Sequence, residues 1–202
     1  MAAPVIGTNA IQIRTYASAA ETELGSISSS LTQLVTACTT VPYWGTNGKD
    51  FKTKTGSNAV EMSTAINTAM KTFIGQVNTA NKAIANTLGG DVTIDNVPAP
   101  TIDLPTIGTT GPGGETGEGM HPTALVDLQT TVNGLRTKIE TATTNHSAAL
   151  NSTPEWQGNQ KESALLGCKA FKDKVDAAVQ AGFKAINDAI AAQHAATTSA
   201  DA

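Results

Sequence analysis

Apolar and small side chains recur at alternating spacings of three and four residues through four long parts of the chain. In the first half these runs cover residues 13–41 and 62–88, and in the second half they cover 125–149 and 165–190. This spacing places the apolar side chains on one face of an amphipathic helix. The pattern therefore predicts an all-α chain built from two helix-turn-helix hairpins.

A nine-residue pattern, Pro-x-Trp-x-x-Asn-x-Lys-Asp/Glu, occurs once in each predicted turn, and its two copies are 112 positions apart. The copies comprise Pro42, Trp44, Asn47, Lys49 and Asp50 in the first turn, and Pro154, Trp156, Asn159, Lys161 and Glu162 in the second. Proline ends a helix because it lacks a backbone donor. Asparagine followed three residues later by an acid is typical of a capping box. We therefore predict that Asn47 and Asn159 cap the second helix of each hairpin.

The tryptophan in each turn has two interpretations. It can fill the apolar interior of the hairpin tip as a packing residue. It can instead be an exposed aromatic side chain that contacts another subunit or protein. The sequence leaves both open for Trp44 and Trp156.

Between the hairpins lies a segment rich in proline and glycine. It carries five acidic residues and no lysine or arginine. Such a composition predicts an extended linker with short edge strands rather than a helix. The expected organisation is a first hairpin over 9–90, the acidic linker over 91–121, a second hairpin over 122–195 and a flexible tail over 196–202.

The length of this linker bears on topology. Two hairpins that pack head to tail need a connection that returns along the helices, whereas an up-down-up-down bundle needs only about 2–8 residues. The linker is long enough for the return at about 3.3 Å per extended residue. We expect an antiparallel four-helix bundle of this kind, the alternative being a decorative loop.

Charged residues are scarce in this chain. They make up 15% of it, and the net charge is −4. An acidic chain lacks the basic footprint of a nucleic-acid-binding protein. The low charge reflects either the compositional bias of the source or a surface that packs against other molecules.

The sequence also lacks the signals of a leader, a membrane span or a catalytic centre. We expect no cleavable signal peptide, no membrane insertion, no cofactor and no metal, and we expect that the protein is not an enzyme. The three histidines, His121, His146 and His194, are scattered, and no Gly-Lys-Ser/Thr follows the glycine run. Cys38 and Cys168 are expected to be reduced packing residues, because no expected arrangement brings them together.

Trp156-Gln157-Gly158 in the second turn resembles the Trp-x-Gly signature of the early secreted antigen (WXG) family, the leaderless substrates of type VII secretion. In the first turn, Trp44-Gly45-Thr46, the glycine comes one place earlier. Proteins of that family form head-to-tail dimers of hairpins, so the resemblance implies that this chain is such a dimer fused into one polypeptide. The family's export signal, Tyr-x-x-x-Asp/Glu, is missing at both Tyr16 and Tyr43.

The resemblance implies a non-enzymatic protein-interaction module that is exported or acts as an adaptor in a type VII-like system. The alternative is a self-assembling structural subunit of a filament, phage or injection particle. The expected location is accordingly secreted without a leader, particle-associated or, as an alternative, cytoplasmic. Partners are other proteins or further copies of this chain. The candidate contact residues are those of the turns: Pro42, Trp44, Asn47, Asp50, Pro154, Trp156, Gly158, Asn159 and Glu162.

Overall fold

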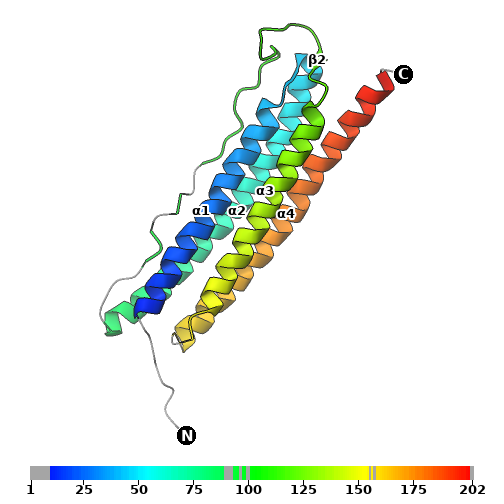
Figure 1. Ribbon diagram of the computed structural model, residues 1–202. Helices are drawn as coiled ribbons and strands as arrows, with labels where there is room; N and C mark the ends of the chain where they lie inside the picture. Colours follow the sequence, from blue (N-terminus) through cyan, green and yellow to red (C-terminus); the bar gives the residue numbers. More distant parts are fainter. Residues whose placement is uncertain are drawn as a thin grey trace. The chain divides into compact units, whose positions relative to one another are not determined.

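A computed structural model describes residues 10–88, 93–95, 97–98, 101–154, 156 and 158–200. Within these residues the chain has four helices and two short strands (Figure 1). In chain order they are α1 (Ala10–Thr40), β1 (Tyr43–Trp44), α2 (Gly45–Leu88), β2 (Gly119–Met120), α3 (Ala124–Asn151) and α4 (Asn159–Ala200). The prediction of an all-α chain is confirmed.

Helix α3 begins at Ala124, within the second hairpin predicted over 122–195, because His121 and the two residues after it form a turn. Helix α4 continues to Ala200, so residues 196–200 are helical rather than part of a tail. Gly89 and Gly90, at the end of the first hairpin predicted over 9–90, lie outside the described residues.

The chain divides into two compact units, and each helix contributes one segment to each unit. Unit 1 comprises Met1–Ser28, Ala65–Pro100 and Ile139–Asp176. Unit 2 comprises Ser29–Thr64, Thr101–Lys138 and Ala177–Ala202. Each unit therefore takes segments from both predicted hairpins.

The core of unit 1 contains side chains from all four helices. Leu24 of α1, Met70 of α2, Ile139 of α3 and Val175 of α4 are all buried. Each of them lies on the apolar face that the three- and four-residue spacing predicts. Four aromatic side chains and a histidine add to this core: Tyr16, Phe73, Trp156, Phe171 and His146.

The core of unit 2 is built in the same way, from Leu31 of α1, Ala59 of α2, Val132 of α3 and Phe183 of α4. Helices α2 and α4 approach each other closely at Gly182. A Cβ atom built there would lie 2.5 Å from the sulfur of Met62. Glycine at this position therefore lets Met62 pack directly on the α4 backbone.

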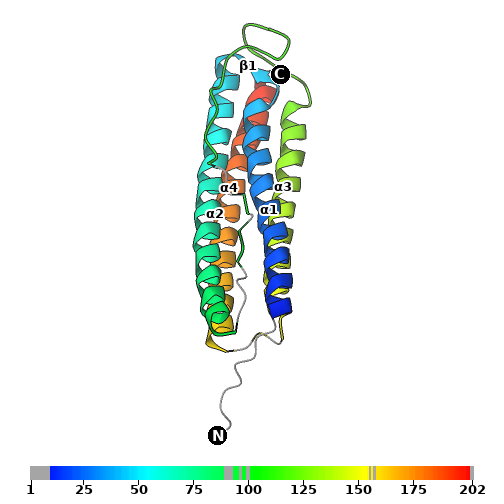
Figure 2. The same ribbon diagram turned by 90° about the vertical axis from the view of Figure 1, so that its left-hand side faces the viewer.

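The segment between α2 and α3 follows the helices through specific contacts in each unit. In unit 1 the side-chain amide of Asn78 donates to the carbonyl of Ile94 at 3.1 Å and accepts from its N–H at 2.8 Å. Ile94 itself is buried. In unit 2 the side chain of Leu104 lies over Gly56 of α2, where a Cβ atom would come within 2.7 Å of it. The described residues of this segment contain no helix (Figure 2).

Candidate interaction site

The first turn, in unit 2, is a two-stranded sheet built around Trp44. Strands β1 and β2 are antiparallel, with Tyr43 opposite Met120 and Trp44 opposite Gly119. A Cβ atom on Gly119 would lie 2.3 Å from Cζ2 of the Trp44 ring. The backbone of Gly119 therefore rests directly against the indole, which only glycine allows.

The start of α2 is capped by Glu118, not by Asn47 as predicted. Helix α2 begins at Gly45, and the Glu118 carboxylate accepts hydrogen bonds from the backbone N–H groups of Thr46 at 2.6 Å and Asn47 at 3.1 Å. A carboxylate at a helix N-terminus satisfies free donors and opposes the positive end of the helix dipole. The capping group therefore comes from a residue 71 positions away from Asn47.

Glycine determines the backbone at the start of both second helices. Gly45 has φ of 84° and Gly158 has φ of 97°, a conformation that side chains other than glycine rarely adopt. The two glycines differ by one place relative to their tryptophans, yet each stands where the turn enters the helix. The glycine of each motif thus has a local backbone role.

Beside Trp44, His121 completes an aromatic pair at the surface. The two rings are 5.8 Å apart and nearly perpendicular, at 87°. The N–H of His121 donates to the carbonyl of Pro42 at 3.0 Å, which fixes the backbone of the histidine next to β1. His121 is exposed and Trp44 is half-buried, so part of the indole remains accessible.

A shallow groove of about 190 Å³ lies between the end of α1 and the start of α3. Its lining is mainly apolar and consists of Ala37, Thr40, Val41, Pro42, Ala124, Asp127, Leu128 and Thr131. Pro42 is hydrogen-bonded to His121, so the groove adjoins the Trp44–His121 pair. We call Trp44, His121 and this groove the Trp44 surface.

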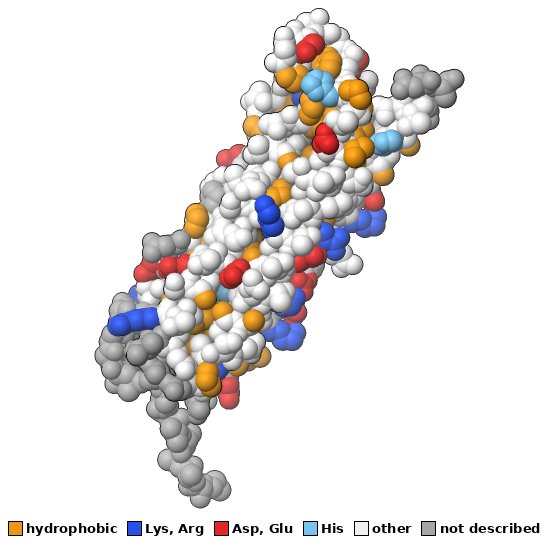
Figure 3. All heavy atoms as spheres, viewed as in Figure 1, with side chains coloured by type: hydrophobic (Ala, Val, Ile, Leu, Met, Phe, Trp, Pro, Cys, Tyr) orange, Lys and Arg blue, Asp and Glu red, His pale blue; other side chains and the backbone are white. Residues whose placement is uncertain are grey.

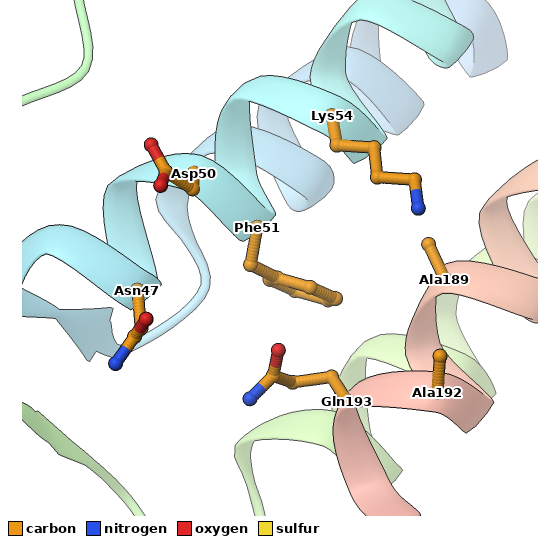
Figure 4. Close-up of a pocket in the computed structure, with 7 residues that line it drawn as sticks. All are labelled: Asn47, Asp50, Phe51, Lys54, Ala189, Ala192 and Gln193. Carbon is orange, nitrogen blue, oxygen red and sulfur yellow. The ribbon is translucent and has the colours of Figure 1, made fainter. Parts of the chain in front are cut away.

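A second cavity in unit 2, of about 270 Å³, lies between the start of α2 and the end of α4 (Figure 4). The ring of Phe51 points into it, toward Gln193. Its polar rim includes Asn47, Asp50 and Lys54. Gln193, which also lines the cavity, donates a hydrogen bond to the Tyr43 hydroxyl at 2.9 Å and so connects α4 to β1. Asn47 and Asp50 of the turn motif thus line this cavity.

The second turn, in unit 1, buries its tryptophan. Trp156 is 0% exposed, and its ring lies 6.1 Å from that of Tyr16. Its indole N–H has no hydrogen-bond partner among the described residues. Of the two interpretations of Trp156, packing inside the hairpin tip is the one that this burial matches.

Around this turn the other motif residues are at the surface. Pro154, Gly158, Asn159 and Glu162 are exposed. Helix α4 begins at Asn159, and its first backbone hydrogen bond runs from the N–H of Glu162 to the carbonyl of Gly158 at 3.1 Å. Gly158 rather than Asn159 therefore occupies the capping position.

Unit 1 also contains a buried polar cluster that sequence spacing does not reveal. The Tyr16 hydroxyl lies 3.1 Å from Nε2 of His146, and the Cys168 sulfur lies 3.8 Å from Nδ1. Phe73 and Phe171 meet the imidazole edge-on. His146 itself is 0% exposed.

The electrostatics of this cluster keep its members neutral. Burial lowers the pKa of His146 to about 4 and raises the pKa of Tyr16 and of Cys168 above their ordinary values. A nucleophilic thiol requires the opposite shift, a lowered pKa that favours the thiolate. The geometry therefore supports a packing role for Cys168. Cys38, in unit 2, is likewise free and buried, as predicted.

The described residues contain no group of three or more His, Cys, Asp or Glu side chains that could hold a metal ion. Among the described helices, none has the length and apolar character needed to cross a membrane.

Charged side chains are sparse on the face shown in Figure 3, where uncharged polar groups and backbone predominate. Several lysines on α4 are paired with acids one turn away, among them Lys169 with Asp173 at 2.8 Å. Lys184 and Asp188 are paired in the same way, and both pairs are well exposed. Such exposed pairs contribute little to stability, because water and salt screen the two charges.

No protein-family model, no curated protein and no solved structure matches this chain. The resemblance to the WXG family therefore rests on the turn motif and the helical hairpins alone.

Proposed function

We propose that this chain is a non-enzymatic protein-interaction module, a fused pair of WXG-like hairpins that is exported or acts as an adaptor in a type VII-like system. In this proposal the two hairpins pack head to tail as an antiparallel four-helix bundle, with the acidic linker returning along it. The turn motif supports the proposal, since both copies combine a tryptophan with a positive-φ glycine at the start of a long helix.

The observation that carries the proposal is the contrast between the two tryptophans. Trp156 is enclosed in unit 1, whereas Trp44 is half-buried beside the exposed His121 and an apolar groove. Partly exposed aromatic side chains next to an apolar recess are the features around which protein interfaces form. We therefore assign partner binding to the Trp44 surface and core packing to Trp156.

A non-enzymatic role is favoured by the state of the nucleophilic and basic groups. The histidine and cysteine that lie together, His146 and Cys168, are buried among aromatic rings and held neutral. A substrate would have no path to them without opening the core of unit 1.

Site-specific photo-crosslinking in the native cell tests this proposal. A photoreactive residue at Thr131, which is exposed and lines the groove on α3, should capture a discrete partner protein. The same residue at Lys169, exposed on α4 in unit 1, is the matched control. Trp44→Ala should abolish the adduct at 131 and leave any adduct at 169 unchanged. Equal capture at both positions, or capture that is insensitive to Trp44, would contradict the assignment.

Export is tested separately. The protein should appear in the culture supernatant only when a type VII system is intact, and its presence in the absence of that system would remove this part of the proposal.

The alternative, a self-assembling structural subunit, is favoured by one observation. Leu166 on α4 is a large apolar side chain that is 70% exposed, and a contact with a neighbouring copy would bury it. Electron microscopy of the purified protein decides between the two functions. Regular polymers that disappear in Leu166→Ser would support the structural role, whereas discrete particles under all conditions would support the interaction module.

A further inference from the structure

Part of the Trp44 indole is covered by residues 109–121, which we call the strap. Besides Gly119, Gly111 also lies against the ring, since a Cβ atom there would be 3.0 Å from Cδ2 of Trp44. Two glycine backbones thus pack on one aromatic side chain. The strap therefore limits how much of Trp44 a partner can reach.

The strap contributes almost no apolar side chain to the core. Its one buried residue is Gly111, Met120 is half-buried, and its other residues other than Gly119 are exposed. Burial of apolar area provides most of the stability of a folded segment, at about 25 cal/mol per Å². Closure of the strap must therefore depend on other interactions.

Those interactions are backbone pairing and one carboxylate. The N–H of Gly45 donates to the carbonyl of Thr109 at 2.7 Å, and the β1–β2 pairing holds the other end of the strap. Between these two ends, the Glu118 carboxylate accepts hydrogen bonds from the N–H groups of Thr46 and Asn47. Among the described hydrogen bonds, those of Glu118 are the only ones from a strap side chain to α2. In them a negatively charged carboxylate accepts from the N–H groups at the positive end of the helix dipole.

The backbone of the strap also favours release. Gly114 and Gly117 have φ of 87° and 86°, and neither has a neighbouring atom within 4 Å of a would-be Cβ. Glycines gain more conformational freedom on unfolding than other residues. A segment with exposed hydrogen bonds and few buried apolar contacts opens at a lower free energy than the helices around it.

From these contacts we infer that the strap is a releasable cover of Trp44 and that the bond from Glu118 to the start of α2 keeps it closed. Release uncovers the indole face and frees the N–H groups of Thr46 and Asn47 in the same step. The inference rests on the proposed function only in regarding the uncovered face as part of the partner site. A partner that needs the open form would bind with an apparent affinity reduced by the open fraction.

Hydrogen exchange on the purified protein tests the strap without any partner. In Glu118→Ala the amides of Thr46 and Asn47 should exchange about fivefold faster or more, the factor expected when a helix loses a terminal carboxylate. Acrylamide quenching of tryptophan fluorescence should rise in the same variant, because Trp44 is freed while Trp156 remains buried. Asp103→Ala, which removes one exposed negative charge from the same non-helical segment, is the matched control.

Glu118→Gln keeps the shape of the side chain and an acceptor oxygen. The amides of Thr46 and Asn47 should therefore exchange at an intermediate rate in this variant. Unchanged amide exchange in the unit 1 part of α2 shows that the fold is intact in each variant. If exchange at Thr46 and Asn47 accelerates less than about threefold in Glu118→Ala, the inference of a releasable strap is overturned. Equal acceleration in Asp103→Ala would overturn it as well. Absence of any adduct at 131 when Trp44 is present would remove the partner site and leave this result unaffected.

Discussion

The hydroxyl of Tyr16 on α1 and Nε2 of His146 on α3 lie 3.1 Å apart although 130 residues separate them in the chain. With the Cys168 sulfur at Nδ1, both nitrogens of this buried imidazole have a polar neighbour. A neutral imidazole suits these two neighbours, since one nitrogen donates and the other accepts. The cluster thus links stability in unit 1 to the protonation state of one histidine.

The stability of unit 1 should decrease in mild acid because of His146. Its pKa falls from 6.5 to about 4 through burial, so the unfolded chain takes up a proton at a higher pH than the folded one. The contribution of neutral His146 to the free energy of unfolding is fully present above about pH 6.5. About 3 kcal/mol of it is lost as the pH falls to 4. Urea unfolding from pH 8 to 4 measures it. His146→Gln should lose this part of the pH dependence, whereas His194→Gln should retain it because His194 is exposed.

The two tryptophans should differ sharply in their contribution to stability. Trp156→Ala leaves a large cavity in the core of unit 1 and should lower the free energy of unfolding by about 3–5 kcal/mol. Trp44 is half-buried, so Trp44→Ala should cost about 1–2 kcal/mol. Chemical denaturation of both variants, followed by circular dichroism, makes the comparison. Equal losses would contradict the assignment of Trp156 to the core and Trp44 to the surface.

Gly119→Ala should disturb the packing of the strap on Trp44. The new methyl would overlap the indole, so we expect a loss of about 1–3 kcal/mol and a shift of the Trp44 fluorescence. Gly108→Ala is the matched control, because a Cβ atom at Gly108 meets nothing within 4 Å. Combining Gly119→Ala with Trp44→Ala should remove most of the penalty. Full additivity of the two substitutions would show that the glycine and the ring do not interact.

Neither thiol should react readily in the folded protein. Burial raises the pKa of Cys38 to about 12, so only about one thiol in ten thousand is ionised at pH 8. Cys168 is also buried and its pKa is raised. Mass spectrometry after iodoacetamide treatment should show alkylation about a hundredfold slower in the native protein than in urea. Rapid native labelling of either cysteine would contradict the described cores.

The helix faces could be predicted from the sequence, whereas the contacts of the first turn could not. Apolar positions such as Leu24 and Val132 follow a local repeat, and both are buried as predicted. The capping of α2 depends on Glu118, which tertiary structure brings to Thr46 from 72 positions away. Asn47 matches the local capping pattern, yet a distant carboxylate occupies the place that its side chain was expected to fill.

The different surroundings of Trp44 and Trp156 could not be predicted from the local sequence either. Their local sequences match, so a local pattern assigns them one role. Trp156 is enclosed by side chains from other helices, such as Tyr16, whereas Trp44 faces glycine backbone and His121. Burial is thus decided by residues far away in the sequence. The turn motif indicates Trp44 as a candidate contact residue, whereas the Gly-rich run of the strap predicts only an extended linker.

The distance between the two turns tests the proposed head-to-tail pairing of hairpins most directly. Spin labels at Lys49→Cys and Asn159→Cys, in a chain with Cys38 and Cys168 replaced by alanine, report this distance by pulsed electron paramagnetic resonance. Helix α1 has 31 residues, a length of about 45 Å at about 1.5 Å per residue. The control pair, Lys49→Cys with Ala192→Cys, lies across the unit 2 cavity that Asn47 and Ala192 line and should give a short distance. The proposal predicts a separation above about 35 Å for the first pair, and a separation below about 20 Å would place both turns at one end and contradict it.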